Sequence, residues 1–345
     1  MLSDRTKITI YDVAARANVA ISTVSRVLNN SNDVSERTRA RVLKAVEELR
    51  YRPDRTARKL AQQRTNTVAI ALPTFTTPFH NELLKGIRSC LQDLEVDLLL
   101  CDLGWRSPLK SLQNFLKRGA VDGLLVAGLQ MNEAVADELA TLHSPVVLIG
   151  SNWPSFDCFV WDDGVGAREA VDHLLRQGHR RIGMIRAFTE SDIQNERVGG
   201  YKSALAAAGV AFDPELVVSG DTIKHAGFSE EAGYEAMQRL LRLDDRPTAI
   251  FASSDVQAIG AWKAADDAGL RVPADLAVVG YDDIKTSMYL GLSSVDQSIQ
   301  QIGRSATERL LSRFSDGADA PPINEHIIPK LRVRRSSTRP PGNPS

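Results

Sequence analysis

A short stretch near the N-terminus carries side-chain types that can read the edges of DNA bases. Ile21, Ser22 and Arg26 occupy the early, outward-facing positions of a segment with helical spacing. An Arg side chain can donate two hydrogen bonds to O6 and N7 of guanine, a Ser can reach several bases, and an Ile can contact a thymine methyl group. These three residues are therefore predicted to read sequence in a major groove.

Polar residues around them suit contacts to phosphates, which position a protein on DNA without specifying a sequence. Thr23, Ser25 and Asn29 lie within or just after the same segment. Thr9 and Tyr11, at the start of the preceding segment, complete the predicted set of DNA contacts in this region.

Three short helices are expected to hold these side chains. The first covers residues 9–17, the second covers residues 21–28, and the third runs from Ser35, a good N-cap residue, to about residue 49. Asn18 tolerates the left-handed turn that must separate the first two. Two short helices joined by a three-residue turn have the geometry of a helix-turn-helix. An ordinary small helical bundle has the same spacing, so spacing alone leaves both interpretations open.

The charge distribution separates a basic head from an acidic body. Residues 1–64 hold 14 Lys and Arg against 7 Asp and Glu, whereas the remainder holds 28 against 36. A basic head suits contact with phosphates, although a solvated basic face would have the same charge.

The rest of the chain predicts a large α/β core. Short apolar runs alternate with amphipathic helices such as 165–177 and 255–268, which is typical of parallel sheets flanked by helices. Enough strands are present for two such sheets. The predicted strands are 67–72, 96–101, 121–127, 145–149, 180–186, 215–219, 248–252 and 275–280.

Several other classes of protein are disfavoured. Cys90, Cys101 and Cys158 have neither disulfide nor metal spacing, so each is expected to be a buried, reduced thiol. No apolar run approaches the ~18–20 residues of a membrane helix, and the N-terminus lacks the apolar region of a signal peptide. No nucleotide-binding loop, nucleophile elbow or zinc motif is present. We expect a cytoplasmic protein that is not an enzyme and has no cofactor and no metal.

The N-terminal region resembles the headpiece of the LacI/GalR family of bacterial repressors. The match covers about 60 residues, ITIYDVAARANVAISTVSRVLN from Ile8 and VSERTRARVLKAVEELRYRPDRTARKLA from Val34. The resemblance implies that residues 54–61 form a hinge helix that folds on DNA beside its twin from a second subunit. Leu60 stands where the family inserts a leucine into the minor groove, with Arg58 and Lys59 beside it. A linker leucine that packs on the core is the alternative.

The core resembles the effector domain of the same family, which has the fold of periplasmic sugar-binding proteins and a chain that crosses three times between two lobes. The matching segments are PTFTTPFHNELLKGI (73–87), QNERVGGYKSAL (194–205), TAIFASSDVQAIGAW (248–262), VPADLAVVGYDDI (272–284) and VDQSIQQIG (295–303). The resemblance places Phe79, Arg197, Asp255, Asp282 and Gln297 around an effector between the lobes. Each has a structural alternative: Arg197 as a surface charge, Asp255 as a helix cap, Asp282 as a residue that holds a turn.

Two departures from the family pattern affect the ligand. Ser254 replaces an Asn, and Thr222 stands where some members carry an aromatic residue; Trp105 and Trp153 lie in loops that could replace that stacking surface. Charged and amide groups make directional hydrogen bonds to vicinal hydroxyls, which favours a sugar or sugar derivative.

Together these features predict a sequence-specific DNA-binding transcriptional regulator, most simply a repressor, with double-stranded operator DNA, a sugar-like effector and a second copy of itself as partners. The fold expected is a small all-α helix-turn-helix headpiece followed by an α/β core of two doubly wound parallel-sheet lobes. The predicted boundaries are a headpiece at 1–53, a hinge and linker at 54–64, a core at 65–335 and a frayed tail at 336–345. Within the core, one lobe is assigned 65–161 and 292–322, and the other 162–291 and 323–335.

Overall fold

The computed structural model describes residues 8–28, 31, 33–51, 65–118, 121–188, 191–316 and 320–338. The chain divides into two compact units between Thr65 and Asn66, and each has its own core. The predicted hinge at 54–64 lies outside the described residues.

The first unit contains three helices, as predicted: α1 (Ile10–Ala17), α2 (Ile21–Leu28) and α3 (Glu36–Glu48). Asp12 fixes the start of α1, because its carboxylate accepts hydrogen bonds from the amide and the hydroxyl of Thr9 at 2.7 and 2.8 Å. Asn18 ends α1 in the left-handed conformation, with φ of 48°. The buried side chains that join the helices are Val13, Ala14, Ala17, Val24, Val27, Val42 and Ala45.

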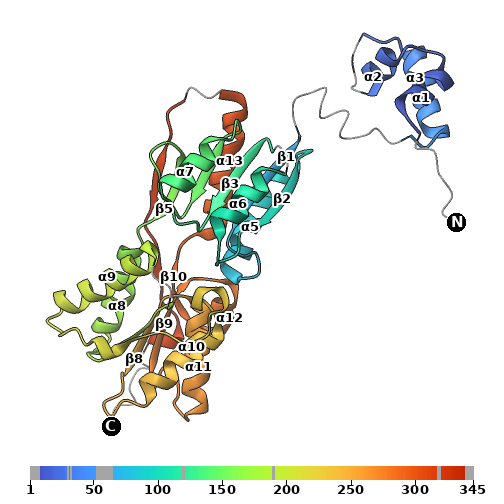
Figure 1. Ribbon diagram of the computed structural model, residues 1–345. Helices are drawn as coiled ribbons and strands as arrows, with labels where there is room; N and C mark the ends of the chain where they lie inside the picture. Colours follow the sequence, from blue (N-terminus) through green and yellow to red (C-terminus); the bar gives the residue numbers. More distant parts are fainter. Residues whose placement is uncertain are drawn as a thin grey trace. The chain divides into compact units, whose positions relative to one another are not determined.

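The second unit contains two six-stranded sheets, one in each lobe (Figure 1). The first sheet has the order β11-β5-β4-β3-β1-β2 and is parallel throughout. Its strands are β1 (Thr67–Leu72), β2 (Asp97–Asp102), β3 (Gly123–Ala127), β4 (Val146–Ile149), β5 (Asp157–Trp161) and β11 (Asn324–Ile327).

The second sheet has the order β12-β10-β9-β8-β6-β7 and is parallel except for the β10–β12 pair. Its strands are β6 (Ile182–Ile185), β7 (Val217–Val218), β8 (Ala249–Ala252), β9 (Ala277–Asp282), β10 (Ser293–Asp296) and β12 (Lys330–Arg332).

Helices cover both faces of each sheet, so the central strands are buried on both sides. On the first sheet, α5 (Pro78–Leu91) and α13 (Ile299–Asp316) cover one face, and α6 (Pro108–Leu116) and α7 (Glu133–Ala140) the other. On the second, α8 (Asp163–Arg176) and α9 (Asp192–Ala207) cover one face, and α10 (Glu230–Leu241) and α11 (Asp255–Asp267) the other. Shorter elements are α12 (Lys285–Leu290), η1 (Pro214–Leu216), η2 (Lys224–Gly227) and η3 (Arg335–Ser337).

The chain crosses between the sheets three times, after β5, after β10 and after β11. The predicted lobe boundaries are wrong at the last two crossings. Residues 293–296 pair with β9 in the second sheet, and residues 324–327 pair with β5 in the first. Both strands are only four residues long, and β11 is largely exposed, so neither produces the apolar run on which the prediction depended.

The predicted fraying of the tail is wrong for residues 336–338. Ser336 and Ser337 are buried, and Ser336 donates a hydrogen bond to the carbonyl of Val278 at 2.6 Å. Small hydroxyl side chains can be buried when each finds a partner, so a Ser-rich composition does not require exposure.

Of the three cysteines, Cys101 and Cys158 are buried as predicted, whereas Cys90 is half-buried; all three are free thiols. None of the helices in the described part of the chain is long and apolar enough to span a bilayer.

Candidate functional site

Helix α2 presents one polar edge to solvent and packs the opposite edge into the core of the first unit. Ile21, Ser22 and Arg26 are exposed, whereas Val24 and Val27 are buried. The two sets separate because side chains three and four residues apart share one face of a helix. The three residues predicted to read bases therefore lie together on the free side of α2.

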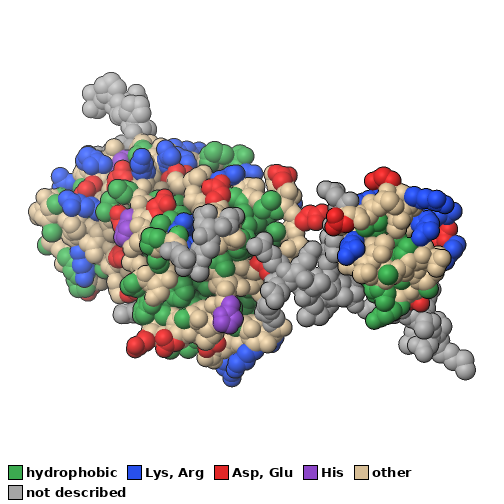
Figure 2. All heavy atoms as spheres, turned by 90° about the horizontal axis from the view of Figure 1, so that it is seen from above, with side chains coloured by type: hydrophobic (Ala, Val, Ile, Leu, Met, Phe, Trp, Pro, Cys, Tyr) green, Lys and Arg blue, Asp and Glu red, His purple; other side chains and the backbone are tan. Residues whose placement is uncertain are grey.

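The other predicted DNA contacts surround that edge or lie outside the described residues. Thr9 and Tyr11 are exposed at the start of α1, and Thr23 and Ser25 are half-buried on α2. Lys and Arg side chains lie on the surface of this unit (Figure 2). Four predicted contacts fall outside the described residues: Asn29, Arg58, Lys59 and Leu60.

A cavity of about 320 Å³ lies between the two lobes of the second unit, where strands of both sheets end. Carboxyl ends of parallel strands are the usual ligand sites of such folds. Three of the five predicted effector contacts, Phe79, Arg197 and Asp282, line it. The other lining residues are Pro73, Thr77, Pro78, His80, Gly104, Trp105, Pro108, Gly128, Leu129, Gln130, Ser191, Ile193, Ala226, Phe228, Ser254, Val256 and Ile284.

Arg197 is fixed in the cavity wall by contacts on three sides. Its guanidinium lies 2.7 Å from a carboxylate oxygen of Asp163, donates to the carbonyl of Ser253 and stacks on the Tyr281 ring at 3.7 Å. Although burial lowers the pKa of Arg197, Asp163 and the other acidic neighbours raise it overall. Arg197 is therefore a preorganised cation.

Asp282 ends strand β9 in a strained conformation, with φ of 109°. Its side chain is 10% exposed and lies 4.0 Å from the Arg197 guanidinium. Burial raises the pKa of Asp282 well above its usual range, although Arg197 lowers it. Its carboxyl oxygens can accept hydrogen bonds at the cavity wall.

The predicted effector contact at Asp255 is wrong, since its side chain is fully buried and does not line the cavity. Its carboxyl accepts hydrogen bonds from the Ile284 amide and from the hydroxyls of Ser287 and Ser294, at 2.9, 2.6 and 2.5 Å. Burial raises the pKa of Asp255 to about 7 despite these bonds. Asp255 holds the turn that follows Asp282, which is a structural role.

Gln297 also stands one layer behind the cavity. It is 1% exposed and does not line the cavity, and its amide donates to Asp163 at 3.3 Å. Gln297 thus supports the carboxylate that holds Arg197.

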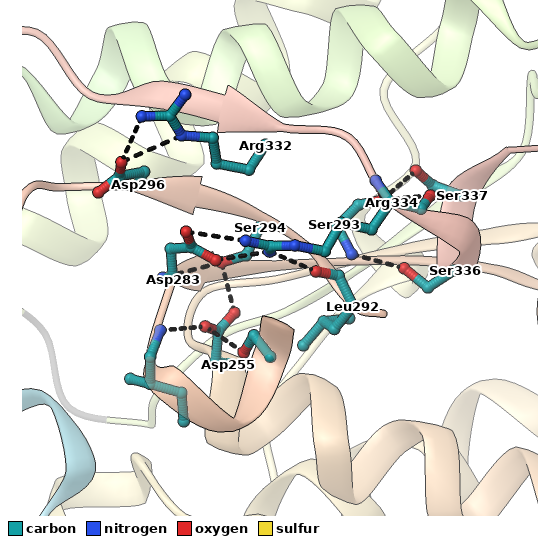
Figure 3. A network of polar contacts seen from close by, with 12 residues as sticks. Asp255, Asp283, Leu292, Ser293, Ser294, Asp296, Arg332, Arg334, Ser336 and Ser337 are labelled. Carbon is teal, nitrogen blue, oxygen red and sulfur yellow. Dashed lines mark hydrogen bonds and ion pairs between the residues drawn. The ribbon is translucent and has the colours of Figure 1, made fainter. Parts of the chain in front are cut away.

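The C-terminal segment holds Asp283, the residue after Asp282, by side-chain contacts (Figure 3). Arg334 binds both carboxylate oxygens of Asp283, at 2.5 and 3.0 Å, and donates to the carbonyl of Leu292. The amide of Asp283 donates to Ser294, whose hydroxyl donates to Asp255. A chain of polar contacts therefore connects Arg334 to the turn at the cavity wall.

Several lining residues were not predicted as ligand contacts. The Nδ1 atom of His80 is hydrogen-bonded to the Thr77 hydroxyl at 2.6 Å. Burial lowers the pKa of His80 to about 4, so its ring is neutral. Phe228 follows η2 and supplies an aromatic side chain that is absent at Thr222. Trp105 reaches this cavity as anticipated, and Trp153 lines the adjoining cavity. A signal existed for Ser254, which departs from the family pattern, but none existed for Phe228.

A second cavity of about 330 Å³ adjoins the first. Trp153 and Trp161 line it, together with four carboxylates, and His326 pairs with one of these, Asp162, at 3.0 Å. The carboxylates belong to Asp162, Asp163, Asp192 and Glu196. Among the described residues, no group of three His, Cys, Asp or Glu side chains is arranged to hold a metal ion.

Two family models match the chain. The model of bacterial regulatory proteins of the lacI family matches residues 9–54, and the model of a periplasmic binding protein-like domain matches residues 171–337.

Curated relatives match nearly the whole chain. The HTH-type transcriptional regulator DegA of Bacillus subtilis is 34% identical over 343 residues, covering 96% of this chain and 98% of the relative. The catabolite control protein A of Priestia megaterium is 35% identical over 314 residues, covering 89% and 92%.

Solved structures agree with the fold. A lac repressor dimer bound to operator and an anti-inducer has a TM-score of 0.83 at 27% identity, covering 97% of this chain and all of that one. A complex of the transcriptional regulator CelR with cellobiose has a TM-score of 0.68 at 32% identity, covering 95% and 99%.

Proposed function

The chain belongs to the lacI family of bacterial regulatory proteins, and from this premise we propose that it represses transcription under the control of a sugar-like effector. Like its relatives it is a DNA-binding transcription regulator, not an enzyme. The observation that carries the proposal is the exposed edge of α2, where Ile21, Ser22 and Arg26 stand together on a packed helix pair.

On DNA, we assign base reading to these three residues. Arg26 pairs with a guanine, Ser22 accepts or donates at a neighbouring base, and Ile21 contacts a thymine methyl. Thr9, Tyr11, Thr23, Ser25 and Asn29 bind phosphates around them. Leu60 inserts into the minor groove, and Arg58 and Lys59 beside it reach the groove or a phosphate. Since the operator is chromosomal DNA, the protein works in the bacterial cytoplasm.

A second copy of the chain completes the operator-binding unit. Strand β2 is the edge of the first sheet, and its Leu99 and Leu100 are 45% and 41% exposed. An apolar edge strand of this kind is normally covered. On the second lobe, Met288 and Tyr289 of α12 are exposed by 55% and 73%. We assign both patches to one two-fold dimer interface, which matches a near-palindromic operator.

The effector binds in the cavity between the lobes, where it changes their relative angle and so the coupling of the headpieces to DNA. Arg197 and Asp282 bind its hydroxyl groups, and Phe79 packs against its ring. Sugar ligands occur among similar structures, which include the cellobiose complex and a family member with bound ribose, 25% identical to this chain.

The DNA assignment is tested by comparing Arg26→Ala with Arg37→Ala on a selected operator and its single-base variants. Both changes remove one exposed positive charge from the headpiece. We expect Arg26→Ala to cost about 1–3 kcal/mol and to relax preference at one base position, whereas Arg37→Ala leaves base preference unchanged. Unchanged preference in the Arg26 variant would remove it from the reading set.

A further inference from the structure

The segment around η2 has a strained backbone. Three successive residues lie in the left-handed region: His225 with φ of 49°, Ala226 with φ of 58° and Gly227 with φ of 91°. Glycine adopts this region readily, whereas a residue with a Cβ atom does so at a cost. Gly227 also needs its missing side chain, since a Cβ atom there would lie 3.0 Å from the Phe188 amide nitrogen. His225 and Ala226 keep this conformation only because their surroundings impose it.

This segment, residues 223–228 and here called the strap, forms part of the wall of the cavity between the lobes. Ala226 is 4% exposed, and both Ala226 and Phe228 line the cavity. The first lobe supplies other lining residues, among them Phe79 and Trp105. The strained turn therefore lies where a ligand would pass or bind.

The strap also approaches the first lobe. Burial, together with the charge of His225, lowers the pKa of His80 to about 4. Burial likewise lowers the pKa of His225, and the carboxylate of Asp102, at the end of β2, acts in the opposite direction. These electrostatic effects cross from one lobe to the other, so His225 lies near the first lobe although its segment follows β7 of the second.

A buried amide side chain anchors the strap. Gln257 on α11 is fully buried, and its amide nitrogen donates to the carbonyl of Gly227 at 2.9 Å. Its amide oxygen accepts hydrogen bonds from the hydroxyls of Ser253 and Ser254 at 2.8 and 3.1 Å. Loss of a partner is costly for a buried polar group, so the bond to Gly227 favours the strained turn.

The anchor is connected to the cation in the cavity wall. The guanidinium of Arg197 donates to the carbonyl of Ser253, whose hydroxyl donates to Gln257. Hydrogen bonds in a buried network influence one another. A ligand that shifts Arg197 therefore acts on the anchor of the strap through one intervening residue.

We propose that the strap is a gate, which closes the cavity while Gln257 holds its left-handed turn and opens when that turn relaxes. The proposal rests on the effector site assigned above and adds what controls entry to it. Opening breaks the bond to Gly227 but relieves the strain at His225 and Ala226. The two effects oppose each other, which brings the closed and open forms closer in free energy than an unstrained loop would allow.

The modification rate of a cavity thiol measures the opening of the strap. Val256 lines the cavity and is 7% exposed, so Val256→Cys places a thiol in the cavity wall. The full-length chain also carries Cys90→Ser, because Cys90 is only half-buried. Pyrenyl maleimide is bulky and iodoacetamide is small. The ratio of their rates, bulky to small, therefore reports access to the cavity.

Two replacements at His225 distinguish backbone strain from loss of the imidazole ring. Glycine relieves the strain of the left-handed turn, and the β-branched valine increases it. We expect His225→Gly to lower the rate ratio by about fivefold, the cost of one left-handed residue, and His225→Val to raise it by a similar factor. Changes in the same direction, or no change in either protein, would overturn the proposal.

Gln257→Leu tests the anchor. It should raise the rate ratio by about tenfold, because the Gly227 carbonyl loses its partner. Tyr201→Phe is the matched control, since it removes a buried hydrogen bond of 2.8 Å to the Ile182 carbonyl, between α9 and β6 of the same lobe. Its ratio should equal the parent's. An equal rise in both variants would indicate general loosening of the lobe and overturn the proposal. Operator binding by the parent protein, measured separately, tests the proposed function independently of this result.

Discussion

Removal of the Arg334 side chain should loosen the turn that carries Asp282 into the cavity. Arg334 and Asp283 are only 20% and 15% exposed, and their two hydrogen bonds form a parallel fork. The pKa of Arg334 is raised by its bond to Asp283, which is the direction expected for a cation that the folded state stabilises. Replacement by Gln would leave a largely buried carboxylate without its charged partner.

A matched control lies two residues earlier on the same segment. Arg332 binds Asp296 at 2.9 and 3.1 Å, but the arginine is 56% exposed and both bonds go to one oxygen. Exposed pairs of this kind contribute about 0.2–1 kcal/mol. For Arg334 we expect about 2–3 kcal/mol, toward the upper end of the range for hydrogen bonds to charged groups.

The two variants can be compared by thermal unfolding and by hydrogen exchange. Since 1 kcal/mol moves the midpoint of a large domain by roughly 2–4 °C, Arg334→Gln should lower the midpoint by about 4–12 °C and Arg332→Gln by less than about 4 °C. The amides of Asp283 and Ile284, which donate to Ser294 and Asp255, should exchange faster only in the Arg334 variant. Equal shifts, or unchanged exchange at the turn, would refute the clamp.

Two further changes probe the dimer surface and the buried carboxyl. Leu100→Lys places a charge on the exposed edge of β2, so it should yield monomers in light scattering and weaken operator binding; a stable dimer would remove β2 from the interface. Asp255 has its pKa raised to about 7, so it binds a proton in the folded state that the unfolded state releases above pH 4. Stability from this group is therefore lost as pH rises from about 4 to about 7. In urea unfolding, the free energy of unfolding of Asp255→Asn should fall less over that pH range than that of the parent. The lowered pKa of His80 acts in the opposite direction, and it does so equally in both proteins. An identical pH profile would mean that Asp255 is ionised throughout.

The elements that the sequence predicted best are those with long or strongly periodic apolar patterns. The predicted bounds of α2 and β1 agree with the structure to the residue, and those of α11 to within one. Strands β5, β10, β11 and β12 were not predicted. β10 contains a single apolar residue, and β11 and β12 are mostly exposed. Those short strands determine where the chain crosses between lobes. Because they were missed, the predicted lobe boundaries were wrong.

The candidate site divides in a similar way. Arg197 and Asp282 could be located because the family pattern around them is strong. Asp255 was misplaced because the same pattern cannot distinguish a carboxyl that faces ligand from one that accepts three bonds behind the wall. The positions of Phe228 and Trp105 depend on loops after strands, whose paths no local pattern encodes.

The most direct test of the central claim is operator selection by the purified protein from random duplex DNA at a fixed, stated salt concentration. We predict enrichment of a near-palindromic sequence whose half-sites each contain a guanine that the Arg26→Ala protein no longer selects. Enrichment of no sequence, or of a motif without two-fold symmetry, would contradict the assignment of the chain as a dimeric, sequence-specific repressor.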